Sequence, residues 1–208
     1  RIPVHQIFHL ACPTGVPNIQ TLAWEMLATC SLGTFNVVDI ARRHRSSVLL
    51  TSSCEVYGQP ERFPQDEGYS GNVHPLGPRS PYEEGKRFAE SLIGTAAQRD
   101  ALNRKVVRIF NTYGPGMSVR DQRVIPQFIT SVLKGEPLTI YGDGRQTRTF
   151  LFVDDILRGL LTIMEHGQPG RAYNIGSEDE VTMRELASKV QSLAPESTSI
   201  AFLPHFTE

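Results

Sequence analysis

Apolar residues recur along the first half of the chain in short runs that alternate with segments of helical period. The runs HQIFHLA, SVLLTSS and KVVRIFN have the length and composition of buried strands. We therefore expect a strand in 5–11, a helix in 21–43, a strand in 47–53, a helix in 80–98 and a strand in 105–111. This order predicts an α/β fold in which crossover helices connect the strands of a parallel sheet.

The pattern changes after Gly114, where the expected elements become shorter. They form a smaller α/β region with a helix in 122–134, strands in 138–142 and 149–153, a helix in 154–165, a strand in 172–176, a helix in 182–193 and a strand in 199–204. We expect the chain to divide into residues 1–113 and 114–208, with about 148–166 packing back on the first part.

Composition narrows the classes of function. Lys plus Arg is 21 and Asp plus Glu is 22, so no basic excess points to nucleic acid or to an anionic membrane surface. No apolar run approaches the roughly 20 residues that span a bilayer, and no signal peptide opens the sequence. Cys12, Cys30 and Cys54 have no metal-binding spacing, so we expect reduced thiols, a reducing compartment and no metal site.

The stretch SPYEEGKR combines a helix start with candidate chemistry. Ser80 can cap the helix, Pro81 suits the first helical position, and Glu83 completes a capping box. Tyr82 and Lys86 then share one helix face. A free tyrosine is a poor base because its pKa is near 10, and we expect the neighbouring ammonium to lower that value.

Two further stretches support a ligand site near this helix. SSCEVYG ends the strand before it and FNTYGPG ends the strand after it. In parallel sheets, ligands bind beyond the carboxyl ends of the strands. Gly85 costs roughly 1 kcal/mol against alanine inside a helix, which a close approach to its backbone would explain.

Four motifs together carry a family resemblance: HPLGPRSPYEEGKRFAE, RIFNTYGPGM, GEPLTIYGDGRQTRTFLFVDD and YNIGSEDE. With them, the chain resembles the extended short-chain dehydrogenase/reductase family of NAD-dependent epimerases and dehydratases, and within it the UDP-glucuronate decarboxylases. The resemblance implies NAD as cofactor and a UDP-sugar as substrate. It also implies that 1–113 is the remaining part of a Rossmann NAD-binding domain and 114–208 mainly a substrate-binding region.

Residues 53–55 distinguish the activities within this family. The 4,6-dehydratases carry an Asp-Glu pair where this chain has Cys54 and Glu55, and the 4-epimerases usually have a small residue in place of Glu55. The decarboxylases have Thr-Ser-Glu, which Ser53-Cys54-Glu55 resembles most. The resemblance therefore implies oxidation of the sugar at C4, loss of CO2 from C6, and reduction to UDP-xylose. A 4-epimerase or a 4,6-dehydratase remains the alternative.

The family pattern also assigns roles to individual residues. Tyr82 is the base at the 4-hydroxyl, Lys86 holds the nicotinamide ribose, and Ser53 bonds the sugar near C4. Glu55 positions the C5/C6 region or handles the C5 proton. The remaining assignments are Leu10, Ala11 and Thr112 to the cofactor, Asn111 to the substrate diphosphate or sugar, Arg123 and Tyr141 to the uridine nucleotide, and Arg148 to the diphosphate.

Several features depart from the family pattern. The sequence has no G-x-G-x-x-G turn, Cys30 replaces an asparagine, and Gly116 replaces an arginine. It stops before an Arg-Lys-Pro-Asp segment of its relatives, and its sheet is expected to be incomplete at the N-terminus. We therefore expect weak or no NAD binding by this chain alone, and a non-catalytic partner subunit is a third possibility. We also expect a homodimer through the helix carrying Tyr82 and the helix before it, and a cytoplasmic location, or the Golgi lumen if an anchor lies upstream.

Overall fold

Four parallel strands form the main sheet, and one of them ends at the predicted site residue Ser53. The computed structural model describes residues 2–193 and 198–204. Its main sheet has the order β1-β2-β3-β8, and every neighbouring pair is parallel. The strands are β1 (Gln6–His9), β2 (Ser47–Ser53), β3 (Arg104–Ile109) and β8 (Ala172–Ile175). This arrangement confirms the predicted α/β fold with a parallel sheet.

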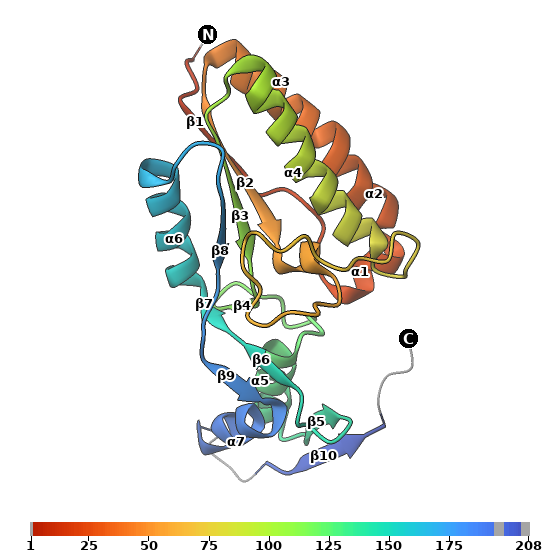
Figure 1. The fold of residues 1–208 in the computed structure, drawn as a ribbon. Coiled ribbons are helices and arrows are strands. Elements are labelled where there is room, and N and C mark those ends of the chain that lie inside the picture. The colour runs from red at the N-terminus through yellow and green to blue at the C-terminus, as the bar shows by residue number, and fades with distance from the viewer. Residues whose placement is uncertain (1, 194–197, 205–208) are drawn as a thin grey trace. The chain divides into compact units, whose positions relative to one another are not determined.

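Helices cover both faces of this sheet (Figure 1). On one face, buried residues of the strands, including Val48, Leu50 and Val106, form a core with Val38 and Ile93 from the helices. The helices on this side are α1 (Val16–Thr21), α2 (Ala23–Ala28), the π-helical turn η1 (Thr29–Gly33), α3 (Thr34–His44) and α4 (Ser80–Asp100). The predicted helix 21–43 is therefore broken at Leu22, whose backbone leaves the helical region.

Helix α6 (Val153–His166) lies on the other face of the sheet (Figure 1). Buried Lys105 of β3 reaches it, because its Nζ donates to the Met164 carbonyl 2.9 Å away. A Cβ added to Gly159 of α6 would lie 2.7 Å from Ile175 Cδ1, so the helix and β8 pack closely at this position.

The start of α4 differs from the predicted capping box. The N-cap residue is Arg79, and within the described part of the chain no side chain caps this helix. Ser80 is already helical, and the backbone amides of Tyr82 and Glu83 bond the Arg79 carbonyl. The Glu83 carboxylate accepts from Arg79 Nε at 3.3 Å instead of reaching back to a backbone amide. The predicted helix is present, but the prediction of its cap was wrong.

Shorter strands and two helices build the rest of the chain. Phe128, Leu138, Ile140, Met183 and Ala187 form its core. Two strand pairs are parallel, β5 with β10 and β4 with β7, whereas β6 and β9 are antiparallel. The elements are β4 (Thr112–Tyr113), α5 (Val124–Lys134), β5 (Leu138–Tyr141), β6 (Thr147–Thr149), β7 (Leu151–Phe152), β9 (Glu180–Thr182), α7 (Met183–Leu193) and β10 (Ile200–Leu203).

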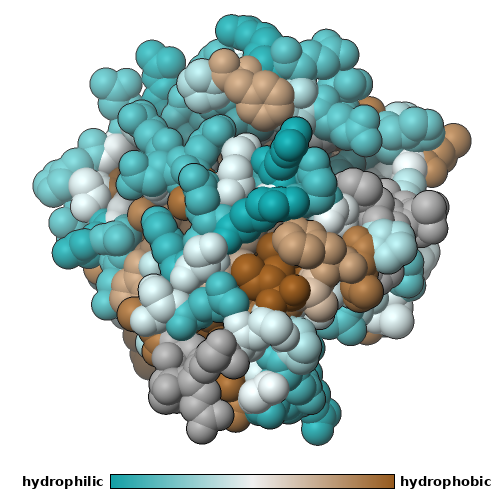
Figure 2. All heavy atoms as spheres, turned by 90° about the horizontal axis from the view of Figure 1, so that it is seen from below, coloured by the Kyte–Doolittle hydropathy of each residue, from teal (hydrophilic) through white to brown (hydrophobic). Residues whose placement is uncertain are grey.

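By internal contacts the chain divides into two compact units. The first unit comprises Arg1–Phe110 and Asp154–Ile175, and the second comprises Asn111–Val153 and Gly176–Glu208. The last residues of the stretch FLPHFTE, 205–208, lie outside the described residues. None of the described helices is long and apolar enough to cross a membrane. Figure 2 shows one face from below, where hydrophobic residues gather in a limited patch among hydrophilic ones.

Candidate active site

Strand β2 delivers Ser53 and Glu55 to the carboxyl edge of the main sheet. Ser53 is the last residue of the strand, and the 3-10 turn η2 (Cys54–Tyr57) follows it directly. The buried Ser53 hydroxyl caps this turn by accepting from the Glu55 amide at 3.3 Å. Burial, followed by the charge of Glu55, raises the pKa of Cys54 to about 12. This thiol therefore keeps its proton at neutral pH.

Helix α4 brings Tyr82 and Lys86 together in the first unit. Lys86 Nζ lies 5.8 Å from the centroid of the Tyr82 ring. The Lys86 side chain is buried, and its ammonium donates to the Thr51 carbonyl of β2 at 2.8 Å. Burial raises the pKa of Tyr82 above its ordinary value, and a hydrogen bond with Ser53 opposes this shift. The expected lowering of this pKa is therefore wrong, because desolvation outweighs the hydrogen bond with Ser53 and the charge of Glu55 acts in the same direction as desolvation.

Sequence reasoning missed Arg79, which lies between two carboxylates. Its Nη2 lies 2.6 Å from Glu55 Oε2, and its Nε lies 3.3 Å from Glu83 Oε1. Burial and the charge of Glu55 raise the pKa of Glu83, while Arg79 lowers it. Arg79 therefore fixes Glu55 against the start of α4. The signal in the sequence that could have identified Arg79 is its position directly before the helix that carries Tyr82.

The end of β1 contributes a histidine to the same unit, and two predicted cofactor residues follow it. Buried His9 lies within hydrogen-bond distance of Thr34, with 3.1 Å between Nε2 and Oγ1. Burial, then the charge of Lys86, lowers the pKa of His9, so the imidazole is neutral at neutral pH. Leu10 and Ala11 follow and are exposed. They lie beyond the carboxyl end of β1, where the family pattern expects the nicotinamide side.

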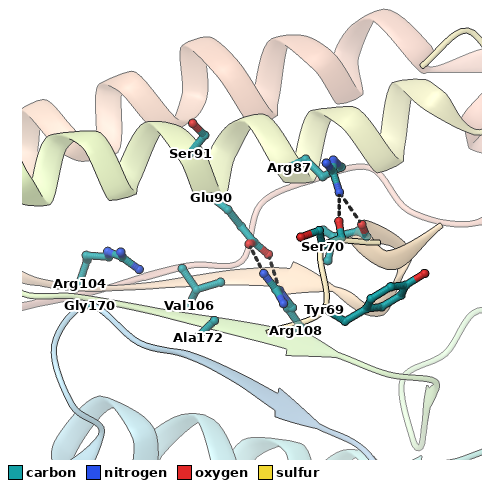
Figure 3. A pocket seen from close by; sticks show the side chains of 11 residues that line it. Tyr69, Ser70, Arg87, Glu90, Ser91, Arg104, Val106, Arg108, Gly170 and Ala172 are labelled. Atoms are coloured by element: carbon teal, nitrogen blue, oxygen red, sulfur yellow. Dashed lines mark hydrogen bonds and ion pairs between the residues drawn. The ribbon is translucent and has the colours of Figure 1, made fainter. Parts of the chain in front are cut away.

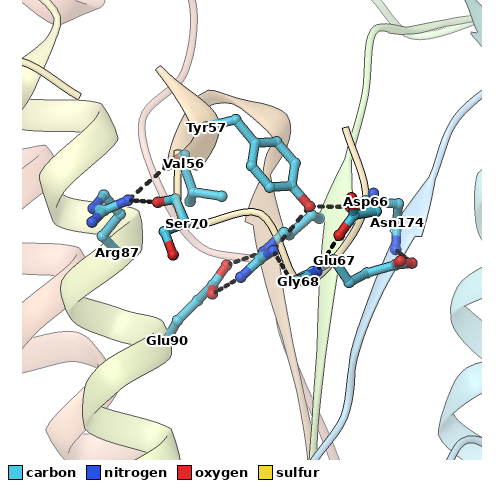
Figure 4. A network of polar contacts seen from close by, with 10 residues as sticks. Val56, Tyr57, Asp66, Glu67, Gly68, Ser70, Arg87, Glu90 and Asn174 are labelled. Carbon is cyan, nitrogen blue, oxygen red and sulfur yellow. Dashed lines mark hydrogen bonds and ion pairs between the residues drawn. The ribbon is translucent and has the colours of Figure 1, made fainter. Parts of the chain in front are cut away.

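A network of polar contacts fixes the loop that follows η2 (Figure 4). The Tyr57 hydroxyl donates to Asn174 Oδ1 at 2.8 Å and accepts from Arg108 Nη1 at 2.9 Å. Arg108 also forms a two-pronged ion pair with Glu90 of α4, with distances of 3.0 and 2.8 Å. Arg87 donates to the carbonyls of Val56 and Ser70. Residues of α4, β3 and β8 therefore hold the segment between η2 and Arg79 on the sheet.

A cavity of about 490 Å³ lies beside this ion pair (Figure 3). Arg87, Glu90, Arg104 and Arg108 line it, and none of the predicted catalytic side chains does. Arg104 Nε is buried and has no hydrogen-bond partner among the residues that the structure describes. The two other arginines already bond the loop and the carboxylate, so the cavity is part of the support for the loop.

The second unit collects most of the predicted substrate residues around one cavity of about 260 Å³. Asn111, Thr112, Arg123 and Arg148 all line it. Tyr141, at the end of β5, is not one of its described lining residues. Four predicted positions, from two of the family motifs and from Arg123 between them, thus meet in one place.

Asn111, Arg123 and Arg148 are exposed, and each is held by a bond to a nearby group. Arg123 forms an ion pair with Asp121, with 2.5 Å between Nη2 and Oδ2. Asn111 donates to the Thr149 carbonyl at 3.1 Å, and Arg148 donates to the carbonyl of the residue before it at 2.8 Å. Gln146 was not predicted from the sequence. Its side-chain amide donates to the Tyr141 carbonyl, and its buried Oε1 accepts no hydrogen bond from the described residues. The cavity therefore offers two guanidinium groups and one buried amide oxygen to a ligand.

Comparison with known proteins identifies the family. A family model described as "NAD dependent epimerase/dehydratase family" matches residues 1–176. The chain belongs to this family. The predicted resemblance to UDP-glucuronate decarboxylases is also confirmed. UDP-glucuronic acid decarboxylase 2 of Arabidopsis thaliana is 44% identical over 204 residues, and UDP-glucuronic acid decarboxylase 1 of Danio rerio is 42% identical over 203 residues.

These matches cover 98% of this epimerase/dehydratase chain but 46% and 48% of the relatives, so the chain spans about half the length of the curated relatives it matches. Among solved structures, a UDP-N-acetylglucosamine 4-epimerase from Methanobrevibacter ruminantium has a TM-score of 0.88 at 25% identity, covering 97% of this chain and 64% of its own. The dTDP-glucose 4,6-dehydratase DesIV from Streptomyces venezuelae, solved with NAD, has a TM-score of 0.82 at 29% identity, covering 98% and 62%.

Proposed function

We propose that this chain carries the reactive site of an NAD-dependent decarboxylase that converts UDP-glucuronate to UDP-xylose. One observation carries the proposal. Ser53 and Glu55 lie at the carboxyl edge of the sheet in the same unit as Tyr82 and Lys86, and the residue between Ser53 and Glu55 in the sequence is a cysteine. Cys54 has a pKa of about 12 and is a far weaker acid than the aspartate of a 4,6-dehydratase. The identity to UDP-glucuronic acid decarboxylases supports the same assignment.

The residues present fit the nicotinamide end of NAD. The Lys86 ammonium has three donors and gives one of them to the Thr51 carbonyl, which leaves two for the hydroxyls of a ribose. Ser52 Oγ, near the end of β2, is buried and lacks a hydrogen-bond partner in the described residues. Lys86 would hold the ribose, with Leu10 and Ala11 of the same unit as further cofactor contacts. Thr112, in the second unit, remains a predicted cofactor contact. Bound NAD would supply the hydride acceptor for C4 of the sugar and the hydride donor for the later reduction.

Tyr82 moves the proton of the sugar 4-hydroxyl. Burial keeps its phenol neutral, so it first needs the Ser53 hydroxyl and the Lys86 charge to stabilise the phenolate that acts as the base. Once C4 is a ketone, the C6 carboxylate is a β-keto acid and loses CO2 as the electron pair moves to C5. Glu55, fixed by Arg79, positions this region and directs the proton that returns to C5.

The cavity of the second unit binds the nucleotide part of the substrate in this proposal. Arg148 contacts the diphosphate, because a planar guanidinium matches two phosphate oxygens at once. Arg123 contacts the same anion or the uridine after leaving Asp121. Asn111 bonds the diphosphate or sugar, and Gln146 Oε1 accepts from a ligand N–H or hydroxyl group. Tyr141 remains a predicted uridine contact outside the lining of the cavity.

The product made from UDP-glucuronate tests the proposal. The chain is incubated with NAD and UDP-glucuronate, and the nucleotide sugars are separated by chromatography and weighed by mass spectrometry. NAD is supplied in large excess because weak binding is expected of this chain alone, and we then expect a UDP-pentose that has lost CO2. A product of unchanged mass at a new elution position indicates a 4-epimerase instead. If no product forms, and the chain restores or alters activity only when mixed with a full-length relative, it is a partner subunit.

We further propose that the chain forms a homodimer through α2–α3 and α4. Large apolar side chains are exposed on these elements, including Trp24, Leu32, Phe35 and Phe88. A cluster of such residues on neighbouring helices is typical of an association surface. We expect sedimentation to show a dimer that Trp24→Glu converts to a monomer. A cytoplasmic location stays a prediction.

A further inference from the structure

Two cysteines from distant parts of the sequence meet in the first unit. Cys12 lies three residues after β1 ends, and Cys30 lies in the π-helical turn η1. Their Sγ atoms are 3.6 Å apart and share a hydrogen bond. Both are free thiols in this structure. A disulfide would require this separation to fall to about 2.05 Å, a small shift that the irregular segment after β1 can supply.

The two thiols differ in access and in protonation. Cys30 is buried in the core and packs on α4, where a Cβ added to Gly85 would lie 3.3 Å from its Sγ. Cys12 is partly exposed. The hydrogen bond with Cys30, and the charge of Lys86, lower the pKa of Cys12 to about 7, whereas the same hydrogen bond, followed by burial, raises the pKa of Cys30. One thiol is therefore a reachable nucleophile and the other is a protonated partner behind it.

We propose that Cys12 and Cys30 form a dithiol modification site that reacts with low-molecular-weight disulfides. The Cys12 thiolate attacks one sulfur of the small disulfide, its S–S bond breaks, and the released thiolate takes up a proton. The Cys30 thiol then loses its proton, and its sulfur attacks Cys12 in the mixed disulfide. The second small thiol leaves as the Cys12–Cys30 bond forms. The protein loses two electrons and two protons, and one small disulfide becomes two thiols.

This inference is independent of the proposed decarboxylation, because it concerns the chain's own thiols. It also explains a feature that the sequence raised. Gly85 sits inside α4 at the point where Cys30 approaches the helix, so the absence of a side chain there makes room for the buried thiol. The disulfide would tie the segment after β1, which carries Leu10 and Ala11, to η1.

Mass spectrometry of the full chain after exposure to oxidised glutathione tests the proposal. The reaction is quenched with acid, free thiols are alkylated, and peptides are mapped. We expect a Cys12–Cys30 disulfide without retained glutathione, while Cys54 is alkylated as a free thiol. In Cys30→Ser, we expect one glutathione to remain on Cys12, because the second thiol is absent. Cys12 should react at least about tenfold faster than Cys54, since its thiolate fraction is far larger.

Three results would overturn the proposal. The first is glutathione retained on Cys12 of the unchanged chain as well as of Cys30→Ser, since Cys30 would then not resolve the mixed disulfide. The second is no modification at Cys12 under conditions that modify Cys54. The third is no reaction of any cysteine. The experiment on the unchanged chain decides the matter even if Cys30→Ser fails to fold, because it requires only the disulfide-linked peptide.

Discussion

The reactive cluster of the first unit and the nucleotide cavity of the second use the same chemical groups in different surroundings. In the first, Arg79 connects Glu55 and buried Glu83, which lies 28 residues after Glu55 in the sequence. In the second, Arg123 pairs with Asp121 two residues away, and both sit on a local turn. The first pairing depends on the sheet and α4 packing correctly, whereas the second forms from neighbouring residues. The fold therefore fixes the arginine of the proposed reactive cluster, whereas a nearby residue of the same turn holds the arginine of the proposed nucleotide cavity.

Removing the Tyr82 hydroxyl from the reactive cluster should have the largest effect on the reaction rate. Tyr82→Phe keeps the ring and deletes the proton acceptor, so we expect the rate of UDP-glucuronate conversion to fall about 10²–10⁴-fold. The matched control is Tyr173→Phe, which removes a hydroxyl that accepts from the Gln168 amide and is not one of the predicted site residues. The control should keep the wild-type rate. Equal losses in both variants would contradict the assignment of Tyr82.

Glycine substitutions test how rigidly the fold holds the first site. Gly58 follows η2 with φ at +62°, and an added Cβ would lie 2.1 Å from the Asn72 carbonyl oxygen. We expect Gly58→Ala to lower the free energy of unfolding by about 3 kcal/mol. In the second unit, Gly135 has φ at +68° with no atom within 4 Å of an added Cβ, so Gly135→Ala should cost only about 1 kcal/mol. Chemical denaturation measures both, and equal losses would show that the close approach at Gly58 is unimportant.

Arg79→Met tests the bridge between the two carboxylates. The substitution leaves Glu55 and Glu83 close together without their common partner, so we expect a loss of about 2 kcal/mol in unfolding free energy. Arg43→Met is the control, because Arg43 pairs with Asp39 on an exposed helix surface. That change should cost at most about 0.5 kcal/mol. A loss at Arg79 no larger than at Arg43 would mean that the bridge contributes nothing to the fold.

The smallest predicted effect is a difference in the sign of pH dependence between Asp121 and Glu83. Arg123 lowers the pKa of Asp121, so its stabilising contribution is present at neutral pH and is lost as the pH falls through the folded-state pKa. Burial raises the pKa of Glu83, so stability from this group rises as the pH falls through that pKa.

Differences between wild type and variants isolate these two contributions. The deficit of Asp121→Asn, about 0.5 kcal/mol at neutral pH, should shrink on acidification. The stability of Glu83→Gln relative to wild type should decline as the pH falls, but at higher pH than the change at Asp121, because the pKa of Glu83 is raised and that of Asp121 is lowered. Denaturation at several pH values measures both differences. Slopes of the same sign would contradict the contrast between a surface pair and a buried carboxylate.

The sequence predicted the fold wherever one pattern dominated. The strand 47–53 and the start of α4 at Ser80 follow from apolar runs and from a proline near the helix start, which act locally. The short strands β4 and β9 escaped prediction because two or three residues carry no readable period. Local pattern also placed Tyr82 and Lys86 on one face, since one helical turn separates them.

The sequence could not predict pKa shifts caused by burial or contacts between residues that are distant in the chain. The raised pKa of Tyr82 depends on desolvation by groups distant in the sequence, which no local motif encodes. The same holds for Arg79, whose partner Glu55 lies 24 residues earlier, and for the Cys12–Cys30 contact, which spans 18 residues. The family pattern named Asn111, Arg123 and Arg148, but the bonds that hold their side chains to neighbouring residues became visible only in the structure.

In the proposed mechanism, Tyr82, supported by Ser53 and Lys86, starts the reaction by taking the proton from the sugar 4-hydroxyl. Single-turnover mixing of the chain, NAD and UDP-glucuronate, followed by the near-ultraviolet absorbance of reduced nicotinamide, tests this step. We expect a transient rise in absorbance with the unchanged chain and none with Tyr82→Phe. An equal rise in both, or decarboxylated product forming without any rise in either, would contradict it.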